Sequence, residues 1–586
     1  MPEQAKLIKP TIKEGLKAME MSRQGEGVAR GRIAVAVAAA LLAMGGNAVA
    51  FEFDTGNAEL QVRWDNTVRY NIATRVEGRD DKFGRSAVTD EGTYSFDNGD
   101  FVANRFDLLS ELDVVYQGKT GFRVSATGWY DAAYDDDSRS NPNAPLVNIP
   151  SYEGHQYSRY TKRLYQGPSG ELLDAFAFAN FDAGEVPVRL KAGRHTVFWG
   201  ESLFLGGALH SVSYAQMPLD LQKGFATPGV EAKELFRPLN QLSGQAQLTD
   251  TLSVAAQYFL QWEAYRYPEG GTYLGPVDFA FNGPDRQFLS PALGFATNGD
   301  ALEPKNRGEY GVSLRWAPAA LDGTLGVYYR RYADKLPQTL LTRVGPGASR
   351  YNLIYADDID LFGVSLAKNI GGVSVGAELS YRRNTPLNAQ VLGISATGLP
   401  DRGDTSGPRG DTFHGLVNVL GLIPDTPLFD QASWAAELTW SRWDKVRRGE
   451  NLFNAVGFAP CEANGTTRPR DLDKWDGCTT KDFWGLGVAF TPTWYQVMPG
   501  VDLSAPMTMS LGLSGNAATV FGGNEGNGNY SLGLAADVFQ KYRIDLKYID
   551  YFGKYRDNGT AVTTQNGFTT LLEDRGFVSL TLKTTF

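Results

Sequence analysis

Apolar and polar residues alternate through most of this chain, and the last segment has the clearest pattern. From Val578 to Phe586 every second residue lies on one largely apolar face, and the residues between them are Ser, Thr and Lys. Successive side chains of a β-strand point to opposite faces of a sheet, so this period of two predicts a terminal strand with one apolar face. Such a strand occurs in soluble β-sandwiches and in transmembrane barrels.

The same alternation marks eighteen segments of the chain. The candidate strands are 57–73, 104–117, 119–134, 172–183, 185–197, 236–249, 251–266, 306–317, 322–333, 357–369, 372–384, 411–422, 431–443, 482–494, 505–517, 528–540, 541–555 and 574–586. Tight turns, such as those at Gly118, Gly184 and Gly371, join every other pair of strands. The remaining connections are long and span 74–103, 135–171, 198–235, 267–305, 334–356, 385–410, 444–481, 518–527 and 556–573.

This alternation of short and long connections favours a barrel over a sandwich. Outer-membrane barrels have short periplasmic turns, long external loops and an even number of antiparallel strands. A β-helix or a propeller would show a sequence repeat of fixed period, and the chain has none. We therefore predict an all-β fold, a transmembrane antiparallel β-barrel of about eighteen strands with a range of about fourteen to eighteen. The barrel-assembly machinery would then read the strand ending at Phe586, and its partner would be the first strand near Leu60 to Tyr70.

Charged side chains gather on one face of the clearest strands. In the first strand Arg63 and Asp65 oppose an apolar face that carries Trp64. A charge facing lipid at the bilayer midplane costs about 2–4 kcal/mol, so these faces are predicted to point inward. The predicted lumen-facing charged residues are Arg63, Asp65, Arg69, Arg105, Asp107, Glu111, Glu309, Arg315, Glu378, Arg382, Arg543, Asp545 and Lys547. Acids and bases nearly cancel, which leaves open a wide pore without charge preference or a packed interior bridged by ion pairs.

The first fifty residues have the pattern of an export signal. Two arginines precede the apolar run 33–44, and Ala48-Val49-Ala50 follows it as an Ala-x-Ala cleavage site. A basic flank, a short apolar run and a small-residue site predict a secretory signal peptide over residues 1–50. A run of about twelve apolar residues is too short to anchor the chain as a membrane-spanning helix. In this interpretation the region before Met21 resembles an over-long start, with Met19 or Met21 as the first residue, and 51–586 form the barrel.

Composition agrees with a barrel exposed to an oxidising compartment. The mean hydropathy is −0.28, as expected when each membrane strand turns only half of its residues to lipid. Aromatic residues make up 12% of the chain, and its formal charge of −10 argues against nucleic acid as a partner. The chain has two cysteines, and we predict a disulfide between Cys461 and Cys478, with two unpaired thiols as the alternative. The predicted location is the outer membrane of a Gram-negative bacterium.

Catalytic and metal-binding patterns are missing from the sequence. The four histidines are scattered, and no HExxH, GxSxG or CxxC motif occurs. A barrel enzyme with a serine nucleophile would need His195 or His210 beside Ser202 or Ser211, and the spacing gives this no support. We predict that the protein is not an enzyme and has no catalytic residues, metal site or cofactor.

The third long connection differs from the others because it is rich in glycine and apolar residues. A wholly external loop would be more polar, so residues 198–235 are predicted to fold inward and narrow the lumen. Within and beside this connection, Arg194, Trp199, Glu201 and Phe204 are the predicted constriction or ligand-binding residues. The alternative is a folded cap outside the barrel.

One motif in this region resembles a known family. The run Gly193-Arg194-His195-Thr196-Val197-Phe198-Trp199-Gly200-Glu201-Ser202 is similar to the Gly-Arg-x-x-x-x-Trp-Gly-Glu-Ser signature of an outer-membrane family of unknown function, domain of unknown function 1302. Further similar stretches are Met217–Asp220 with the later Pro-Gly-x-Glu-x-Lys-Glu segment, Ala377–Arg382 and Asp425–Asp430. The resemblance implies association with a periplasmic lipoprotein-carrier-like protein and an inner-membrane exporter of the resistance-nodulation-division class, and hence traffic of lipids or sterols.

The sequence therefore predicts a barrel that passes hydrophobic or amphiphilic small molecules, with outer-membrane lipid around it and periplasmic partners beside it. Apolar side chains on the third long connection would supply weak, exchangeable binding. Two alternatives stay open. One is a substrate-specific porin for small polar nutrients such as carboxylates, and the other is a plugged structural barrel whose loops bind a partner.

Overall fold

The computed structural model describes residues 51–86, 88–143, 149–226, 232–345, 348–389, 392–394 and 399–586. These ranges are mostly β-sheet, and the helices among them are single short turns. Within these ranges no helix is long and apolar enough to cross a membrane. The predicted signal peptide, residues 1–50, lies outside the described residues.

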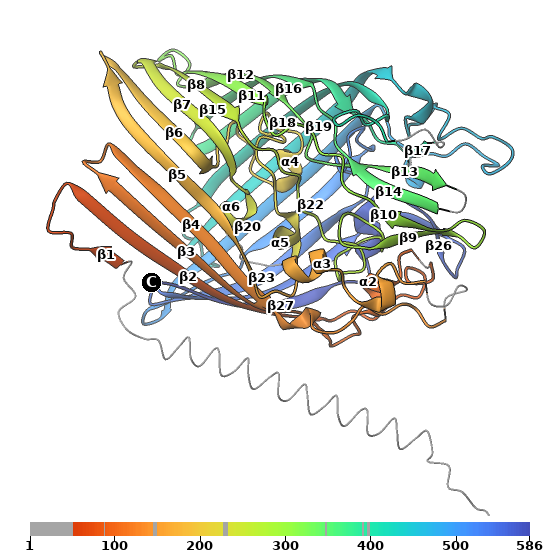
Figure 1. The fold of residues 1–586 in the computed structure, drawn as a ribbon. Helices are drawn as coiled ribbons and strands as arrows, with labels where there is room; N and C mark the ends of the chain where they lie inside the picture. Colours follow the sequence, from red (N-terminus) through yellow and green to blue (C-terminus); the bar gives the residue numbers. More distant parts are fainter. Residues whose placement is uncertain are drawn as a thin grey trace, which may run out of the picture. The chain divides into compact units, whose positions relative to one another are not determined.

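One antiparallel sheet closes on itself to form a barrel (Figure 1). Its strands are β2 (Leu60–Arg75), β3 (Phe101–Tyr116), β4 (Thr120–Asp131), β5 (Ser169–Ala183), β6 (Val186–His195), β7 (Leu239–Thr249), β8 (Leu252–Phe259), β11 (Tyr310–Trp316), β12 (Gly323–Tyr332), β15 (Ile359–Ile370), β16 (Val373–Pro386), β18 (Arg409–Ile423), β19 (Gln431–Arg448), β20 (Asp482–Met498), β21 (Val501–Ser504), β22 (Met507–Ser514), β23 (Gly528–Val538), β24 (Tyr542–Phe552) and β27 (Phe577–Thr585). Strand β27 pairs with β2 from Thr67↔Thr585 to Arg75↔Phe577, and this pairing closes the ring.

Eighteen strand positions make up the ring, because β21 and β22 lie one after the other between β20 and β23. The predicted closed antiparallel barrel is thereby confirmed, as is the pairing of the last strand with the first. A short additional strand, β1 (Phe51–Phe53), pairs with residues 62–64 of β2. It satisfies the part of the β2 edge that β27, which begins its pairing at Thr67, does not reach.

The two faces of the barrel differ as the alternation predicts. Exposed apolar side chains cover the outer face, including Leu190, Leu242, Val312, Val327, Val364, Leu379, Val417, Leu532, Leu534 and Leu546. Side chains of the opposite parity point inward, and many are buried and charged, such as Arg69, Glu378 and Arg382. A membrane barrel needs this arrangement because charge facing lipid is costly, whereas inside the lumen a charge can find a partner.

The long connections contain ordered structure that the sequence pattern did not predict. Five short strands form a second sheet in the order β17-β13-β14-β10-β9. They are β9 (Arg286–Ser290), β10 (Gly294–Asn298), β13 (Gln338–Gly345), β14 (Ala348–Ile354) and β17 (Leu392–Ile394), and β25 (Tyr555–Asp557) pairs with β26 (Val562–Gln565) nearby in the chain. These strands gather at one end of the barrel (Figure 1). They are too short for a period of two to stand out among turn residues.

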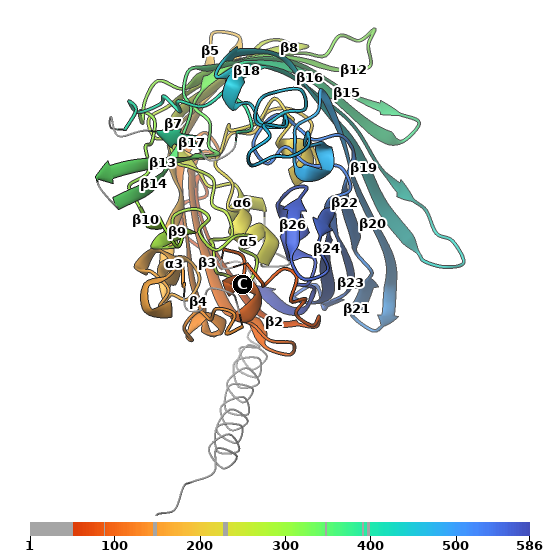
Figure 2. The same cartoon turned by 90° about the vertical axis from the view of Figure 1, so that its right-hand side faces the viewer.

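A disulfide joins two points of another long connection. Cys461 and Cys478 are bonded to each other in the connection between β19 and β20, and both are buried. Short helical turns complete the connections: α2 (Glu91–Tyr94), α3 (Arg159–Leu164), α4 (Leu205–Ala208), α5 (Leu221–Ala226) and α6 (Ala232–Leu235), with 3-10 turns at Ala132–Tyr134, Glu153–His155, Glu450–Leu452, Lys474–Asp476 and Phe568–Leu572. In Figure 2, which looks into the barrel from the loop end, α5 and α6 lie inside the outline of the ring of strands.

The assignment of faces predicts that a substitution by arginine destabilises the barrel at an outward position and has little effect at an inward one. Leu546→Arg puts a charge on the outer face at the middle of β24 and should lower the free energy of unfolding by about 2–4 kcal/mol. Thr508→Arg, at an exposed position of the inner face, should change it by less than about 1 kcal/mol. Denaturant titration of the barrel in lipid vesicles measures both. Equal losses for the two variants would contradict the face assignment.

Candidate functional site in the barrel lumen

The connection from β6 to β7 runs through the interior of the barrel. We call residues 198–235 the lumenal segment; residues 198–226 and 232–235 of it are described, and they contain α4, α5 and α6. Its side chains and backbone contact inward-facing residues of strands on both sides of the ring. The segment therefore occupies the lumen on the side where the long connections lie (Figure 2).

Along one wall the lumenal segment presents apolar side chains. The Trp199 ring lies 6.1 Å from the ring of Tyr328 on β12, measured between centroids. Both residues belong to a buried cluster that continues into the neighbouring connections. Its buried members are Trp199, Val212, Tyr214, Ala215, Leu219, Leu221, Tyr265, Tyr267, Tyr328, Tyr332, Leu336, Ala356, Ile359 and Leu361. An apolar core of this kind inside a barrel removes water from the lumen at this level.

Glycines in the wall make room for this cluster. A Cβ atom at Gly311 on β11 would lie 2.8 Å from the Trp199 ring, and one at Gly363 on β15 would lie 2.5 Å from Val212. Both distances are shorter than a carbon–carbon contact of about 3.5–4.0 Å. The wall and the lumenal segment therefore fit each other only because these inward positions lack side chains.

Two buried carboxylates of the wall bind backbone amides of the lumenal segment. Glu378 on β16 accepts hydrogen bonds from the N–H of Glu201 and, at 2.7 Å, from the N–H of Val212. Glu437 on β19 accepts from the N–H groups of Leu203 and Phe204, at 2.8 and 3.2 Å. The amides of Leu203 and Phe204 directly precede the short turn α4, where backbone N–H groups lack partners within the helix.

Two buried guanidinium groups bind the carbonyls that follow. Arg330 on β12 donates to the carbonyl oxygens of Val212 and Tyr214, at 3.0 and 2.6 Å. Arg382 on β16 donates to the carbonyls of residues 209 and 211, both at 3.0 Å. An irregular segment buried in a lumen must pair its backbone polar groups, and each hydrogen bond to a charged partner contributes about 1.5–3 kcal/mol. The wall supplies these partners with charge of both signs.

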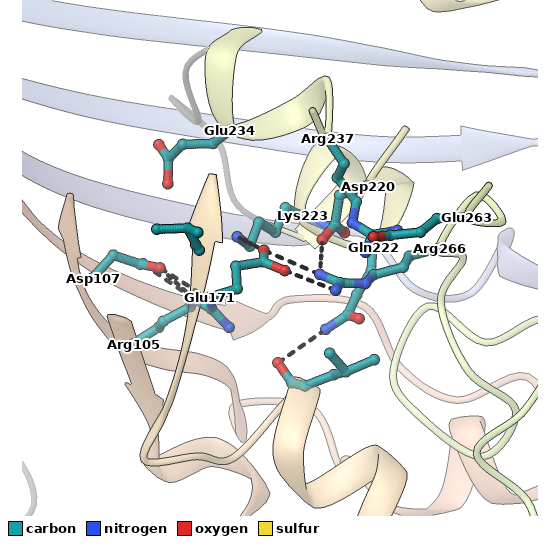
Figure 3. Close-up of polar contacts among 12 residues, drawn as sticks. Arg105, Asp107, Glu171, Asp220, Gln222, Lys223, Glu234, Arg237, Glu263 and Arg266 are labelled. Carbon is teal, nitrogen blue, oxygen red and sulfur yellow. Dashed lines mark hydrogen bonds and ion pairs between the residues drawn. The ribbon is translucent and has the colours of Figure 1, made fainter. Parts of the chain in front are cut away.

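On the opposite wall the lumenal segment enters a network of ion pairs (Figure 3). Glu171 on β5 contacts Lys223 at 3.3 Å and Arg266 at 2.7 Å, and Arg266 also contacts Asp220 at 2.9 Å. Burial lowers the pKa of the Arg266 guanidinium, but the charges of Asp220 and Glu171 outweigh burial and hold this pKa above its ordinary value. Arg266 therefore remains a cation and fixes α5 against the connection that follows β8.

The network continues to the first strands of the barrel. Arg69 on β2 contacts Glu234 of α6 at 2.8 Å and Asp107 on β3 at 3.3 Å, and Arg105 contacts the same aspartate at 3.0 Å. Arg237 pairs with Glu263 beyond the segment. These contacts join five bases and five acids, and Glu263 has a further base as a partner, so charges of the two signs nearly balance. Balanced pairing lets ten charged groups stay in an interior that would be costly for any one of them alone.

The other half of the lumen is open to solvent. Inward-facing side chains near the short turns are exposed, with side-chain exposures of 61% for Arg63 and 48% for Arg315, and Arg189 and Lys191 are also exposed. The Arg315 guanidinium lies 4.0 Å from the Glu201 carboxylate, at the boundary between the two halves. The lumen is therefore a polar vestibule with exposed charged side chains on the turn side and a filled interior on the loop side.

A single family model spans nearly the whole chain. The family, described as "Protein of unknown function (DUF1302)", matches residues 30–586. The chain belongs to the DUF1302 family. This agrees with the resemblance carried by residues 193–202 and with the barrel fold that the resemblance implies. No curated protein matches this sequence significantly.

Solved structures similar to this DUF1302 chain are outer-membrane proteins of low sequence identity. OccAB4 of Acinetobacter baumannii is 9% identical, with 90% of this chain and 98% of that chain covered and a TM-score of 0.37. OccD3 (OpdP) of Pseudomonas aeruginosa is 11% identical, with coverages of 92% and 94% and a TM-score of 0.38. A BenF-like porin from Pseudomonas fluorescens Pf-5 is 10% identical, with coverages of 90% and 98% and a TM-score of 0.38. Likenesses this distant say nothing about ligands, and the barrel assignment rests on the strand pairing itself.

The structure separates the residues predicted for the constriction. Trp199, Glu201 and Phe204 all lie in the lumenal segment, against the wall strands β12, β16 and β20. Arg194 does not join them. It has the parity of the exposed Leu190 on β6, so it faces outward, and it pairs with Glu263 at 3.1 Å. The motif spans the end of a strand, where neighbouring residues point to opposite faces.

Most of the charged residues predicted to face the lumen are buried in the DUF1302 barrel. The buried ones are Asp65, Arg69, Arg105, Asp107, Glu111, Glu309, Glu378, Arg382 and Asp545, whereas Arg63 and Arg315 are exposed and Arg543 and Lys547 are half-buried. Ion pairs join several of them, including Arg63 with Asp65 at 2.8 Å and Arg543 with Asp545 at 3.0 Å. Of the two interiors that the sequence left open, this pairing corresponds to the packed one.

Sequence reasoning did not single out several residues of the site. Arg330 is followed by a second arginine, Arg331, whose side chain points to the opposite face of the strand. The charge pattern therefore did not show which face of this strand points inward. Asp220 and Arg266 lie outside regular elements, and Lys223 lies in the short turn α5, so no apolar–polar period marks any of the three. Their proximity depends on how two long connections meet inside the barrel, and a single sequence carries no signal for that.

Two of the histidines lie close together in the lumen, and a third contacts a serine on β7. His210 of the lumenal segment and His414 on β18 face each other, with 2.9 Å between their Nδ1 atoms, and the Nε2 of His210 donates to the carbonyl of Gly522 at 2.8 Å. Ser211 bonds to Ser213 instead. His195 contacts Ser243 at 2.7 Å, but its other ring nitrogen faces the backbone carbonyl of Gly193 rather than a carboxylate.

The His210 environment predicts that acid loosens the lumenal segment. Burial lowers the pKa of His210 to about 4, and the Arg382 charge adds to this shift, while the hydrogen bond to Gly522 opposes it. The folded pKa lies below the unfolded value of about 6.5, so stability is full above about pH 6.5 and is lost as pH falls toward 4, by up to about 3 kcal/mol. Hydrogen-exchange protection of residues 205–215 should therefore fall between pH 7 and pH 4.5.

The double variant His210→Gln/His414→Gln removes both imidazoles that face each other and should flatten this pH dependence. His155→Gln, in a different connection, should keep it. An unchanged pH dependence in the double variant would show that other groups are responsible.

Proposed function

We propose that this DUF1302 protein is an outer-membrane channel of a Gram-negative bacterium for hydrophobic or amphiphilic small molecules, closed at rest by the lumenal segment. The observation that carries the proposal is the apolar cluster around Trp199 in the interior of the barrel. Ligand sites for apolar molecules are mostly lined by apolar and aromatic side chains with a few polar groups. A lipid-like or sterol-like molecule would find such a surface here, whereas a hydrated ion would not.

The attachment of the lumenal segment supports a closure that can open. Glu378, Glu437, Arg330 and Arg382 hold the segment through side chains, and they sit on strands whose own pairing is independent of it. The segment can therefore move away from this wall without the loss of a barrel strand pair. Conduction also requires binding that is strong enough for entry and weak enough for release.

The vestibule supports a preference for amphiphiles. Arg189 and Lys191 are exposed on its surface, and Arg315 reaches from it toward Glu201. An amphiphile with an anionic head could keep its head among these cations while its apolar part meets the cluster around Trp199. Exposed cations also attract anions over distances up to about the Debye length, near 8 Å at physiological salt.

The same cations favour the second candidate, a porin for small carboxylates. In that function Arg189, Lys191 and Arg315 would attract anions and the lumenal segment would form a narrow eyelet. The third candidate is a permanently plugged barrel, supported by the balanced ion pairs around Glu171 and Arg266.

Partners are part of the proposal as well. Delivery or removal of an apolar molecule through the periplasm would need a carrier, and the family resemblance implies a lipoprotein-carrier-like protein and an inner-membrane exporter. The open vestibule lies at the end of the short turns, which face the periplasm in barrels of this type. The last strand, β27, is the proposed recognition element of the barrel-assembly machinery.

Weakening the anchors should open the channel. Glu378→Gln/Glu437→Gln keeps the shape of both side chains but replaces charged acceptors with neutral ones, which contribute about half as much per hydrogen bond. In planar bilayers the wild type should remain closed for most of the recording, and the double variant should open at least about tenfold more often. Arg63→Gln, a vestibule change remote from the anchors, should behave as the wild type.

Each alternative has its own result. A steady open pore in the wild type, blocked by small carboxylates, would support the porin and contradict the closed channel. The plugged barrel would be supported by the absence of channel opening in both proteins, together with accumulation of a labelled sterol or lipid that does not depend on the gene.

A further inference from the structure

Four aromatic rings from three long connections form a slipped stack beside the lumenal segment. The ring of Tyr267 lies 4.9 Å from that of Phe281 with an interplanar angle of 9°, and 4.6 Å from that of Phe521 with an angle of 20°. Phe521 stacks in turn on Phe568 at 4.6 Å and 29°. Most other aromatic pairs in the described residues meet edge-on or tilted, so a set of near-parallel planes is a distinct arrangement.

Two of these phenylalanines have an unfavourable backbone conformation. Phe281 has φ of 70° and Phe521 has φ of 57°. Positive φ is an outlier for a bulky side chain, and such outliers cluster at ligand sites and switch regions. Phe521 is followed by Gly522 and Gly523, which would tolerate this conformation at no steric cost. Both residues with this backbone conformation contribute their rings to the stack.

The stack leads from solvent to the interior of the barrel. Phe568 is 38% exposed, whereas Tyr267 is 6% exposed and belongs to the buried cluster that contains Trp199. Phe281 and Phe521 pack against that cluster from outside. The rings thus make a continuous aromatic surface between the loop side of the molecule and the apolar part of the lumen.

The loop that carries Phe521 also touches the lumenal segment directly. The carbonyl of the next residue, Gly522, accepts the hydrogen bond from His210. A change in the position of Phe521 would therefore act on a contact that helps to hold the segment in the lumen.

We propose that this stack is the entry site for a flat, fused-ring apolar molecule, which adds its own plane to the exposed ring of Phe568. The inference rests on the proposed function and narrows its substrate class from apolar molecules in general to planar ring systems. Offset stacking stabilises the binding of a flat ring system, whereas a flexible acyl chain of equal area cannot stack on the ring. The site lies on the loop side, so molecules enter there and reach the cluster around Trp199.

Relaxation-edited ¹⁹F NMR of the full barrel in lipid nanodiscs tests this site directly. The probe is 6-fluoro-2-naphthol, the comparison probe is the acyclic 6-fluorohexan-1-ol, and empty nanodiscs give the background for each. Naphthol should bind the wild type at least about tenfold more tightly than the alkanol. Phe521→Leu and Phe568→Leu keep apolar area but remove the ring, and each should weaken naphthol binding at least about tenfold.

Phe539→Leu is the matched control, because Phe539 is 69% exposed, also has positive φ at 52°, and lies in the short turn between β23 and β24. It should leave naphthol binding unchanged. Equal binding of both probes, or unchanged naphthol binding in Phe521→Leu and Phe568→Leu, would overturn the proposal. Heat-modifiable gel mobility verifies that each variant is a folded barrel.

This binding measurement is independent of conduction. If ring-specific binding is absent and the channel opens normally, the entry site is contradicted and the proposed channel stands. If ring-specific binding occurs in a barrel that never opens, the entry site stands and the proposed channel is contradicted.

Discussion

Charged side chains of the barrel wall meet backbone groups of an irregular segment, and the arrangement of the lumen depends on these contacts. The lumenal segment pairs part of its backbone in its own short turns, and burial would leave further amides and carbonyls unpaired without the wall. Glu378 and Glu437 satisfy amides, and Arg330 and Arg382 satisfy carbonyls. Unpaired buried groups would cost about 1–3 kcal/mol each. This constraint explains why the inner faces of membrane-spanning strands carry charged side chains. It also explains why the barrel can stay intact while the lumenal segment fills its interior.

The fold could be predicted because a membrane barrel imposes a period of two on every strand. Alternation located the strands, and the contrast between short turns and long loops set their number at eighteen, with the terminal strand paired to the first. The second sheet of β9, β10, β13, β14 and β17 could not be predicted in the same way. Its strands are short and lie among turn residues, and their neighbours in the sheet come from separate connections.

The site was less predictable than the fold. The apolar content of residues 198–235 distinguished this connection, and Trp199, Glu201 and Phe204 do lie against inward-facing side chains. Arg194 occupies a strand position whose side chain points to the outer face. Treating residues 193–202 as a single motif obscures this difference in direction. Partners such as Arg266 depend on contacts between distant connections. The positive φ of Phe521 is likewise set by tertiary packing, since nothing in its sequence neighbourhood requires it.

The central claim is that the lumenal segment rests against the inner wall, and a cysteine cross-link tests it most directly. A Cβ atom at Gly363 would lie 3.4 Å from the Cβ of Val212, near the separation of about 3.8 Å in disulfides. In Val212→Cys/Gly363→Cys barrels in the outer membrane, mild oxidation should join the two residues within one chain, as identified by mass spectrometry of the linked peptides. Folded barrels that leave both cysteines free under the same conditions would contradict the account.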